Sequence, residues 1–132
     1  MAEITYQHSA ADVTERELAG FFVGWPRQPS DEQRGRVLQA AHEVVIARDE
    51  HGTLVGFVTA ITDGVFAAFI PLVEVLPDFQ RRGIGSALVE RMLDRLRECY
   101  SIDLVCDDDV APFYERLGGT RIGAIAWRRT TA

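Results

Sequence analysis

Hydrophobic and polar positions along the 132-residue chain form short apolar runs separated by turn residues, together with stretches of helical spacing. Apolar or alternating runs between turn residues predict strands. The expected strands cover residues 4–8, 43–48, 53–61, 66–76, 102–106 and 120–128. The run 66–76 is almost wholly apolar, which predicts a central strand buried on both faces, and Glu74 is its one charge.

Four helices are expected from apolar residues that recur every three or four positions. They cover residues 12–22, 30–41, 83–99 and 110–117. Asp12 or Thr14 can cap the first, and Ser30, followed three positions later by Gln33, has the capping-box pattern for the second. The acids at 107–109 offer a cap for the last, and a glycine pair ends it.

The order of these elements predicts the fold class. One α/β domain spanning residues 1–132 is expected, with a central mixed sheet of about six or seven strands flanked by about four helices. The strand–helix–strand unit over residues 66–106 predicts a right-handed parallel crossover. The length allows one core, and the sequence contains no repeat and no linker.

Composition excludes several classes of function. A net charge of −6 argues against general affinity for nucleic acid or an anionic membrane. The longest uncharged apolar run, residues 64–73, is too short to cross a bilayer, and the first residues have no signal pattern. A cytoplasmic location is therefore expected.

The two cysteines and three histidines show no metal-ligand spacing, so no metal is expected. Cys106 falls in an apolar strand and is expected to be a small buried residue rather than a nucleophile. All fourteen basic residues are arginine. The simpler explanation is coding bias. The alternative is that an enzyme that acylates amines benefits from having no lysine ε-amines of its own, and the sequence does not distinguish the two explanations.

The stretch between the strand at 66–76 and the helix at 83–99 predicts an anion site. Gly83 and Gly85 permit close backbone approach, and the first N–H groups of the helix have no intrahelical partner. The helix dipole favours negative charge there, and Arg81 and Arg82 add positive charge at the rim. A plain strand-to-helix turn is the alternative reading.

Comparison with the known phosphate-binding motifs reduces the number of possible ligand types. A P-loop requires a lysine, which this chain lacks, and a dinucleotide motif requires a third glycine where Leu88 stands. The segment Gln80-Arg81-Arg82-Gly83-Ile84-Gly85 resembles the Q/R-x-x-G-x-G/A motif of the GNAT superfamily of acyl-CoA-dependent N-acyltransferases. The run Pro112 to Gly118 resembles the second recurring motif of that family, F-Y-x-x-x-G-F, with Gly119 in place of the final aromatic residue.

The resemblance covers nearly the whole chain and implies acetyl-CoA as the co-substrate. It places the pyrophosphate on the backbone of Arg81, Arg82, Gly83, Ile84, Gly85 and Ser86, with Gln80 beginning the motif. It places the pantetheine arm against the backbone of Val73 and Val75, in a gap between that strand and the strand at 102–106. Asp107 holds a position where relatives often carry an asparagine that meets the cofactor arm.

The same resemblance implies Tyr114 as the general acid that protonates the leaving thiolate; a packing role is the alternative. Glu74 is the candidate base, because a carboxylate buried in an apolar strand has a raised pKa. If it points out of the sheet instead, it is merely solvated. Trp25 either lines the acceptor pocket or joins two helices, and Asp108 with its neighbours either attracts a cationic amine or forms a solvated cap.

The expected function is transfer of the acetyl group of acetyl-CoA to a primary amine by direct attack in a ternary complex. The alternative is an inactive domain of the same fold that binds acyl-CoA as a sensor or scaffold. A nucleotide-phosphate module of another fold is a third hypothesis. The acceptor is not indicated, and either a monomer or a homodimer is compatible with the sequence.

Overall fold

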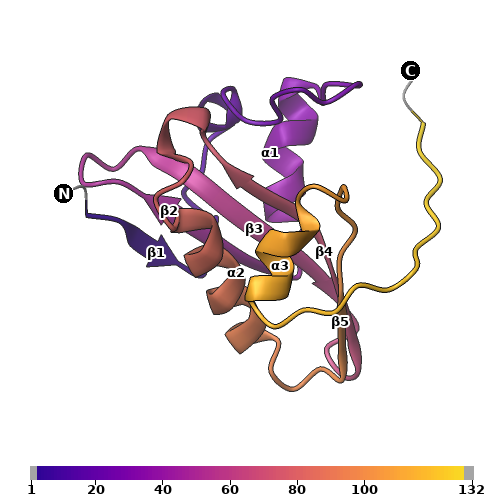
Figure 1. Ribbon diagram of the computed structural model, residues 1–132. Helices are drawn as coiled ribbons and strands as arrows, with labels where there is room; N and C mark the ends of the chain where they lie inside the picture. Colours follow the sequence, from indigo (N-terminus) through magenta and orange to yellow (C-terminus); the bar gives the residue numbers. More distant parts are fainter. Residues whose placement is uncertain (1–2, 130–132) are drawn as a thin grey trace.

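The computed structural model describes residues 3–129 and forms an α/β fold around one sheet (Figure 1). The elements in chain order are β1 (Thr5–Gln7), the 3₁₀ helix η1 (Arg16–Leu18), α1 (Asp31–Gln39), β2 (Glu43–Arg48), β3 (Leu54–Thr62), β4 (Ala67–Val75), the 3₁₀ helix η2 (Pro77–Phe79), α2 (Ile84–Arg95), β5 (Ser101–Asp103) and α3 (Ala111–Arg116).

The sheet is mixed, as the sequence predicts, with strand order β1-β2-β3-β4-β5. The first four strands pair antiparallel, and β4 pairs with β5 in parallel. The helix α2 provides the crossover between these two strands. The described residues hold five strands and three α-helices, fewer than the six or seven strands and four helices expected.

Two apolar cores lie on opposite faces of the sheet. The helix α2 buries Leu88 and Met92 completely against one face. The other face is covered by Leu18 of η1, Leu38 of α1 and Phe22 of the intervening loop. Alternate residues of a strand point to opposite faces, so Val73 and Val75 pack on the α2 side. Glu74 lies opposite Phe57 of the second core and points the other way.

The capping box predicted for α1 is confirmed. The Ser30 hydroxyl accepts from the N–H of Gln33 at 3.1 Å, and the Gln33 side chain accepts from the N–H of Ser30 at 2.9 Å. The helix expected at 12–22 is wrong in its extent, because only one 3₁₀ turn forms. The turn ends at Leu18, and Phe22, four residues later, adopts a left-handed φ of 65° that a continuous helix would not allow.

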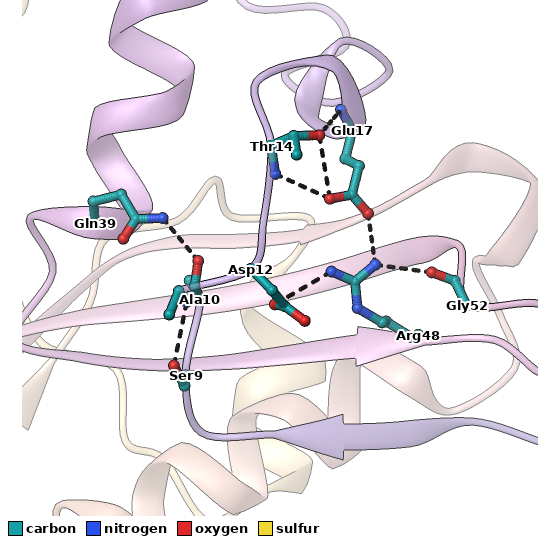
Figure 2. A network of polar contacts seen from close by, with 9 residues as sticks. Ser9, Ala10, Asp12, Thr14, Glu17, Gln39, Arg48 and Gly52 are labelled. Atoms are coloured by element: carbon teal, nitrogen blue, oxygen red, sulfur yellow. Dashed lines mark hydrogen bonds and ion pairs between the residues drawn. The ribbon is translucent and has the colours of Figure 1, made fainter.

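A polar network around Arg48 holds the N-terminal loop against the sheet (Figure 2). The Arg48 guanidinium, with its side chain only 13% exposed, donates to Glu17 at 2.6 Å and to the carbonyl oxygen of Gly52 at 2.8 Å. Asp12 lies 3.5 Å away on its other side. Because Arg48 is on β2 and Glu17 on η1, this network fixes the start of the loop that carries Phe22.

The expectation that β4 is buried on both faces is wrong. Ala68 and Ile70 are buried under α2, whereas Ala67, Phe69 and Pro71 are exposed. The covering layer on that face consists of η1, α1 and their loop, and it stops short of this end of the strand.

The strand expected at 120–128 is also wrong. The segment is extended but pairs with no strand among the described residues. Figure 1 shows it leaving α3, passing β5 and running beyond the sheet.

Candidate active site

The site is organised by the point at which β4 and β5 separate. Their parallel pairing begins at Ala67 and Ser101 and ends at Phe69 and Asp103. Beyond it, β4 continues to Val75, whereas β5 stops. Pro71 lies just after the last pair and has no N–H to give to a neighbouring strand. The C-terminal half of β4 therefore has a free edge that faces a gap.

The residues predicted to bind an anion lie where the chain leaves β4 and enters α2. Among the described residues, no N–H group from Arg81 to Ser86 donates a hydrogen bond to the protein. Both Arg81 (φ 66°) and Gly83 (φ 81°) are left-handed, and such turns gather N–H groups into a concave anion site. A left-handed arginine is uncommon, and its strain is consistent with a functional backbone conformation.

Three motif side chains have structural roles. The Gln80 amide turns back and donates to the carbonyl oxygen of Val75 at 3.1 Å, which joins the cradle to the end of β4. The Arg82 guanidinium lies over the Phe79 ring at 5.0 Å. The side chain of Ile84 is buried in the α2 core. Gln80 and Ile84 can therefore serve the ligand through the backbone, whereas the arginines are exposed at the rim.

Gly85 lies close to both β4 and α3. A Cβ built there would lie 3.5 Å from the Phe113 ring of α3 and 3.8 Å from the side chain of Val75. The glycine therefore stands between the end of β4 and α3. A Cβ fits there at ordinary contact distance, and a side chain longer than that of alanine would meet Phe113 or Val75.

Glu74 lies on the opposite face of β4 and is not solvated outside the sheet. Its Oε1 accepts a hydrogen bond from the N–H of Phe22 at 2.9 Å. Burial raises the pKa of the Glu74 carboxyl, while hydrogen bonds from Phe22 and from the Trp25 side chain act in the lowering direction. The carboxylate is thus held in place but keeps a raised affinity for protons, as a general base requires.

Trp25 packs against the loop that precedes it and is also partly exposed. Its ring packs edge-on against Phe22, with centroids 5.0 Å apart, yet 41% of the residue is exposed. Together with its contact to Glu74, this places Trp25 at the surface beside the candidate base. It does not join two helices, because the segment before it is a 3₁₀ turn and loop.

Tyr114 is half-buried on α3. Burial raises the pKa of its hydroxyl, and the Cys106 thiol and the Glu74 carboxylate raise it further. Tyr114 also lines a groove together with residues 102–106, the segment that includes the end of β5. A raised pKa keeps the phenol protonated, so that it can donate a hydrogen bond.

Three expectations for the loop after β5 are corrected or refined. Cys106 is only partly buried and lies beyond the end of β5. The cap of α3 is Val110 with no side-chain hydrogen bond, so the acids before it do not cap the helix. The carbonyl oxygen of Asp107 accepts from the N–H of Val110 at 3.0 Å while its side chain is exposed. Asp108 lines a groove that also contains Tyr114.

Within residues 3–129, no three histidine, cysteine or acidic side chains come together as a metal site. In the same part of the chain, no helix is both long and apolar enough to cross a membrane.

Sequence reasoning missed Phe22 and Gln28. The Gln28 amide donates to the carbonyl oxygen of Phe22 at 2.9 Å. The backbone of Phe22 is therefore held through its carbonyl oxygen as well as through the N–H that binds Glu74. No local pattern indicates a left-handed phenylalanine. Phe113 stood inside the recognised F-Y motif, but its contact with the glycine cradle was not anticipated.

Comparison with known proteins identifies the class of protein. The chain belongs to the acetyltransferase (GNAT) family, whose model matches residues 10–119. A putative acetyltransferase from Deinococcus radiodurans R1 has 46% sequence identity and a TM-score of 0.91, over 96% of this chain and 89% of that one.

Two curated relatives match at lower identity. An uncharacterized N-acetyltransferase ycf52 from Pyropia yezoensis is 32% identical over 73% of this chain and 58% of its own length. Histone acetyltransferase TAP1 from Glycine max is 33% identical over 73% of this chain and 46% of its own length. The chain thus spans about half the length of the curated relatives it matches.

Proposed function

We propose that residues 1–132 act as one N-acetyltransferase domain that transfers the acetyl group of acetyl-CoA to a primary amine. The observation that carries this proposal is the hydrogen bond from the N–H of Phe22 that holds the partly buried Glu74 carboxyl on β4, beyond the point at which the pairing of β4 with β5 ends. The free N–H groups of residues 81–86 support a pyrophosphate site at one end of the gap. A cytoplasmic location remains a prediction.

The donor binds on the α2 side of the sheet. The pyrophosphate accepts hydrogen bonds from the N–H groups between Arg81 and Ser86, and the arginines at the rim add charge. The pantetheine arm runs past Gly85 and pairs with the free edge of β4 near Val73. The thioester then lies in the gap, with the acceptor amine on the Glu74 side.

Glu74 removes a proton from the ammonium form of the acceptor, directly or through water, because only the neutral amine is a nucleophile. The amine nitrogen attacks the thioester carbonyl carbon. As the tetrahedral intermediate collapses, the carbon–sulfur bond breaks and the Tyr114 hydroxyl donates a hydrogen bond, and then its proton, to the thiolate. The attacking nitrogen loses its remaining extra proton, through water, to the Tyr114 phenolate, which gives the neutral amide and restores the phenol. Asp108 and Trp25 border the site and are proposed to contact the acceptor.

The test is release of free CoA thiol from acetyl-CoA with a panel of amines. The panel includes a histone-tail peptide, because one relative is named a histone acetyltransferase, together with polyamines and amino sugars. The proposal is supported if the wild-type chain turns over at least one amine and the variant Glu74→Gln loses this turnover. Tight acetyl-CoA binding by calorimetry with no turnover on any amine would favour the non-catalytic acyl-CoA sensor instead.

A further inference from the structure

The loop between η1 and α1 carries two groups that act on the Glu74 carboxyl. The N–H of Phe22 donates to its Oε1 at 2.9 Å, and the Trp25 side chain is a second hydrogen-bond donor to it. Between Leu18 and Asp31, a stretch that the structure describes throughout, the loop has no helix or strand of its own. The positions of both donors therefore depend on hydrogen bonds that side chains make with the backbone of the loop.

The Gln28 side chain closes this loop. Its amide nitrogen donates to the carbonyl oxygen of Phe22 at 2.9 Å and lies 3.4 Å from the carbonyl oxygen of Trp25. A primary amide has two N–H donors, so one side chain can bind both carbonyl groups at the same time. The backbone N–H of Trp25 also donates to the Phe22 carbonyl oxygen at 3.4 Å. Gln28 thus holds the backbone of both residues that bind Glu74.

Arg34 on α1 determines which way the Gln28 amide points. Its Nη2 lies 3.5 Å from the amide oxygen, and its Nη1 is paired with Asp31 at 2.8 Å. The Arg34 side chain is only 15% exposed, so packing restricts its position. A guanidinium can only donate, so it faces the amide oxygen and leaves the amide nitrogen to the loop. The first turns of α1 are thereby connected to the loop that holds the carboxyl.

We propose that Gln28 is a positioning residue for the acetyl transfer: it keeps the donors of Phe22 and Trp25 in place on the Glu74 carboxyl. The inference rests on the proposed role of Glu74 as the base. Phe22 holds a left-handed φ of 65°, which is unfavourable for a residue with a Cβ. Without the hydrogen bond from Gln28, its backbone can relax out of this conformation, and the direction in which Glu74 points is no longer fixed.

The basicity of Glu74 reports on this arrangement. The hydrogen bonds from the loop lower the pKa of Glu74, whereas burial raises it and is the larger effect. Weaker hydrogen bonds from the loop should therefore move this pKa further up. Phe57, opposite Glu74 on β3, carries no charge, and Tyr114 on α3 interacts with Glu74 electrostatically. Both stay in place when Gln28 is replaced, so a change in the pKa of Glu74 reports on the loop.

The test compares Gln28→Met with Gln39→Met, because both remove an amide that donates to a backbone carbonyl and keep the length of the side chain. The Gln39 amide donates to the carbonyl oxygen of Ala10 at 2.7 Å. Gln28 is exposed, so its variant is expected to fold. The pKa of Glu74 is measured by carbon-13 NMR of its carboxyl, assigned as the signal that Glu74→Gln removes. It should rise in Gln28→Met and keep the wild-type value in Gln39→Met. The same Glu74 pKa in all three proteins would overturn the proposal.

Kinetics with an amine that the wild-type chain acetylates give a second readout. We expect Gln28→Met to lower kcat by up to about 10²-fold with an unchanged Kd of acetyl-CoA, because a displaced catalytic group slows the chemical step alone. Gln39→Met should keep the wild-type kcat, and an equal loss in both variants would refute a specific role for Gln28. Absence of turnover on every amine would count against the proposed function, whereas the NMR comparison would still decide whether Gln28 positions Glu74.

Discussion

The backbone N–H of Phe22 donates to Oε1 of Glu74 at 2.9 Å, although the two residues are 52 positions apart in the sequence. Phe22 reaches this position only in the left-handed conformation, which costs on the order of 1 kcal/mol for a residue with a Cβ. The buried ring in the core and the hydrogen bond from Gln28 hold it there. The strained loop thus orients a carboxylate whose burial makes it more basic.

Replacing Glu74 separates activity from stability. We expect Glu74→Gln to lower kcat by about 10²- to 10⁴-fold, the usual contribution of a general base. The wild-type rate should fall with decreasing pH at a value above the ordinary glutamate range, because the pKa of Glu74 is raised. This acid limb of the pH–rate profile should be absent from the residual activity of the variant.

The thermal midpoint of Glu74→Gln gives an independent check. A folded-state pKa above the unfolded value means that the folded protein binds more protons, so stability falls as pH rises between the two values. Above that pH window the buried Glu74 carboxyl is ionised, which lowers the free energy of unfolding. The Glu74→Gln variant should therefore melt at the same temperature as wild type, or at a higher one, at pH 7. Glu50→Gln, on the β2–β3 turn, is the control. A large drop in melting temperature for Glu74→Gln would indicate a structural carboxylate instead.

The variant Tyr114→Phe tests the proposed role of Tyr114 as the general acid. We expect kcat to fall by about 10²-fold with little change in the Kd of acetyl-CoA, because the hydroxyl acts on the leaving sulfur and not on the carrier. Since the pKa of Tyr114 is raised, the wild-type enzyme should keep this group protonated beyond the ordinary tyrosine range. The matched control is Tyr100→Phe, at a residue that is 81% exposed. An unchanged kcat for Tyr114→Phe would exclude an essential acid.

Gly83 and Gly52 form a matched pair for testing the anion cradle. Their φ values are 81° and 80°, and at neither would a Cβ meet another atom within 4 Å. Alanine at either position should therefore cost a similar amount of stability, about 1 kcal/mol. Only Gly83→Ala should weaken acetyl-CoA binding in calorimetry, because the strain there reorients the N–H groups of residues 81–86. Equal affinities in the two variants would argue against this placement of the pyrophosphate.

The Arg48 network predicts an acid-sensitive step in stability. The hydrogen bond from Arg48 lowers the pKa of Glu17 below its ordinary value. Glu17 therefore contributes stability that is present above its unfolded pKa and is lost as pH falls through the lower folded one. In urea unfolding below about pH 4.5, Glu17→Gln should show a weaker pH dependence than wild type. Glu32→Gln, in an exposed ion pair on α1, should retain the wild-type dependence.

The sequence predicted those parts of the fold that local patterns determine. The bounds of β2, the capping box at Ser30 and the helix after Gly83 all depend on residues close in sequence, and all three are present. The helix at 12–22 failed because tertiary contacts of Phe21 and Phe22 with Phe57 override a moderate local propensity.

The final strand failed for a different reason. The sequence pattern of residues 120–128 is that of a segment able to form a strand. The pattern does not specify which edge of the sheet this segment would pair with. At the candidate site, the motifs predicted the roles of residues 80–86 and Tyr114, and these roles stay predictions. The Phe22 contact with Glu74 joins residues on separate elements and follows only from their arrangement in space.

The alternation of side chains along β4 has a consequence for how this enzyme can change. Val73 and Val75 face the α2 layer that holds the cradle, whereas Glu74 faces the loop at Phe22 and Trp25. In the proposed arrangement, acetyl-CoA and the acceptor approach through different layers and meet only at the gap. We therefore expect substitutions in the loop at residues 23–28 to change acceptor choice without weakening acetyl-CoA binding, which makes this loop a target for engineering a new substrate.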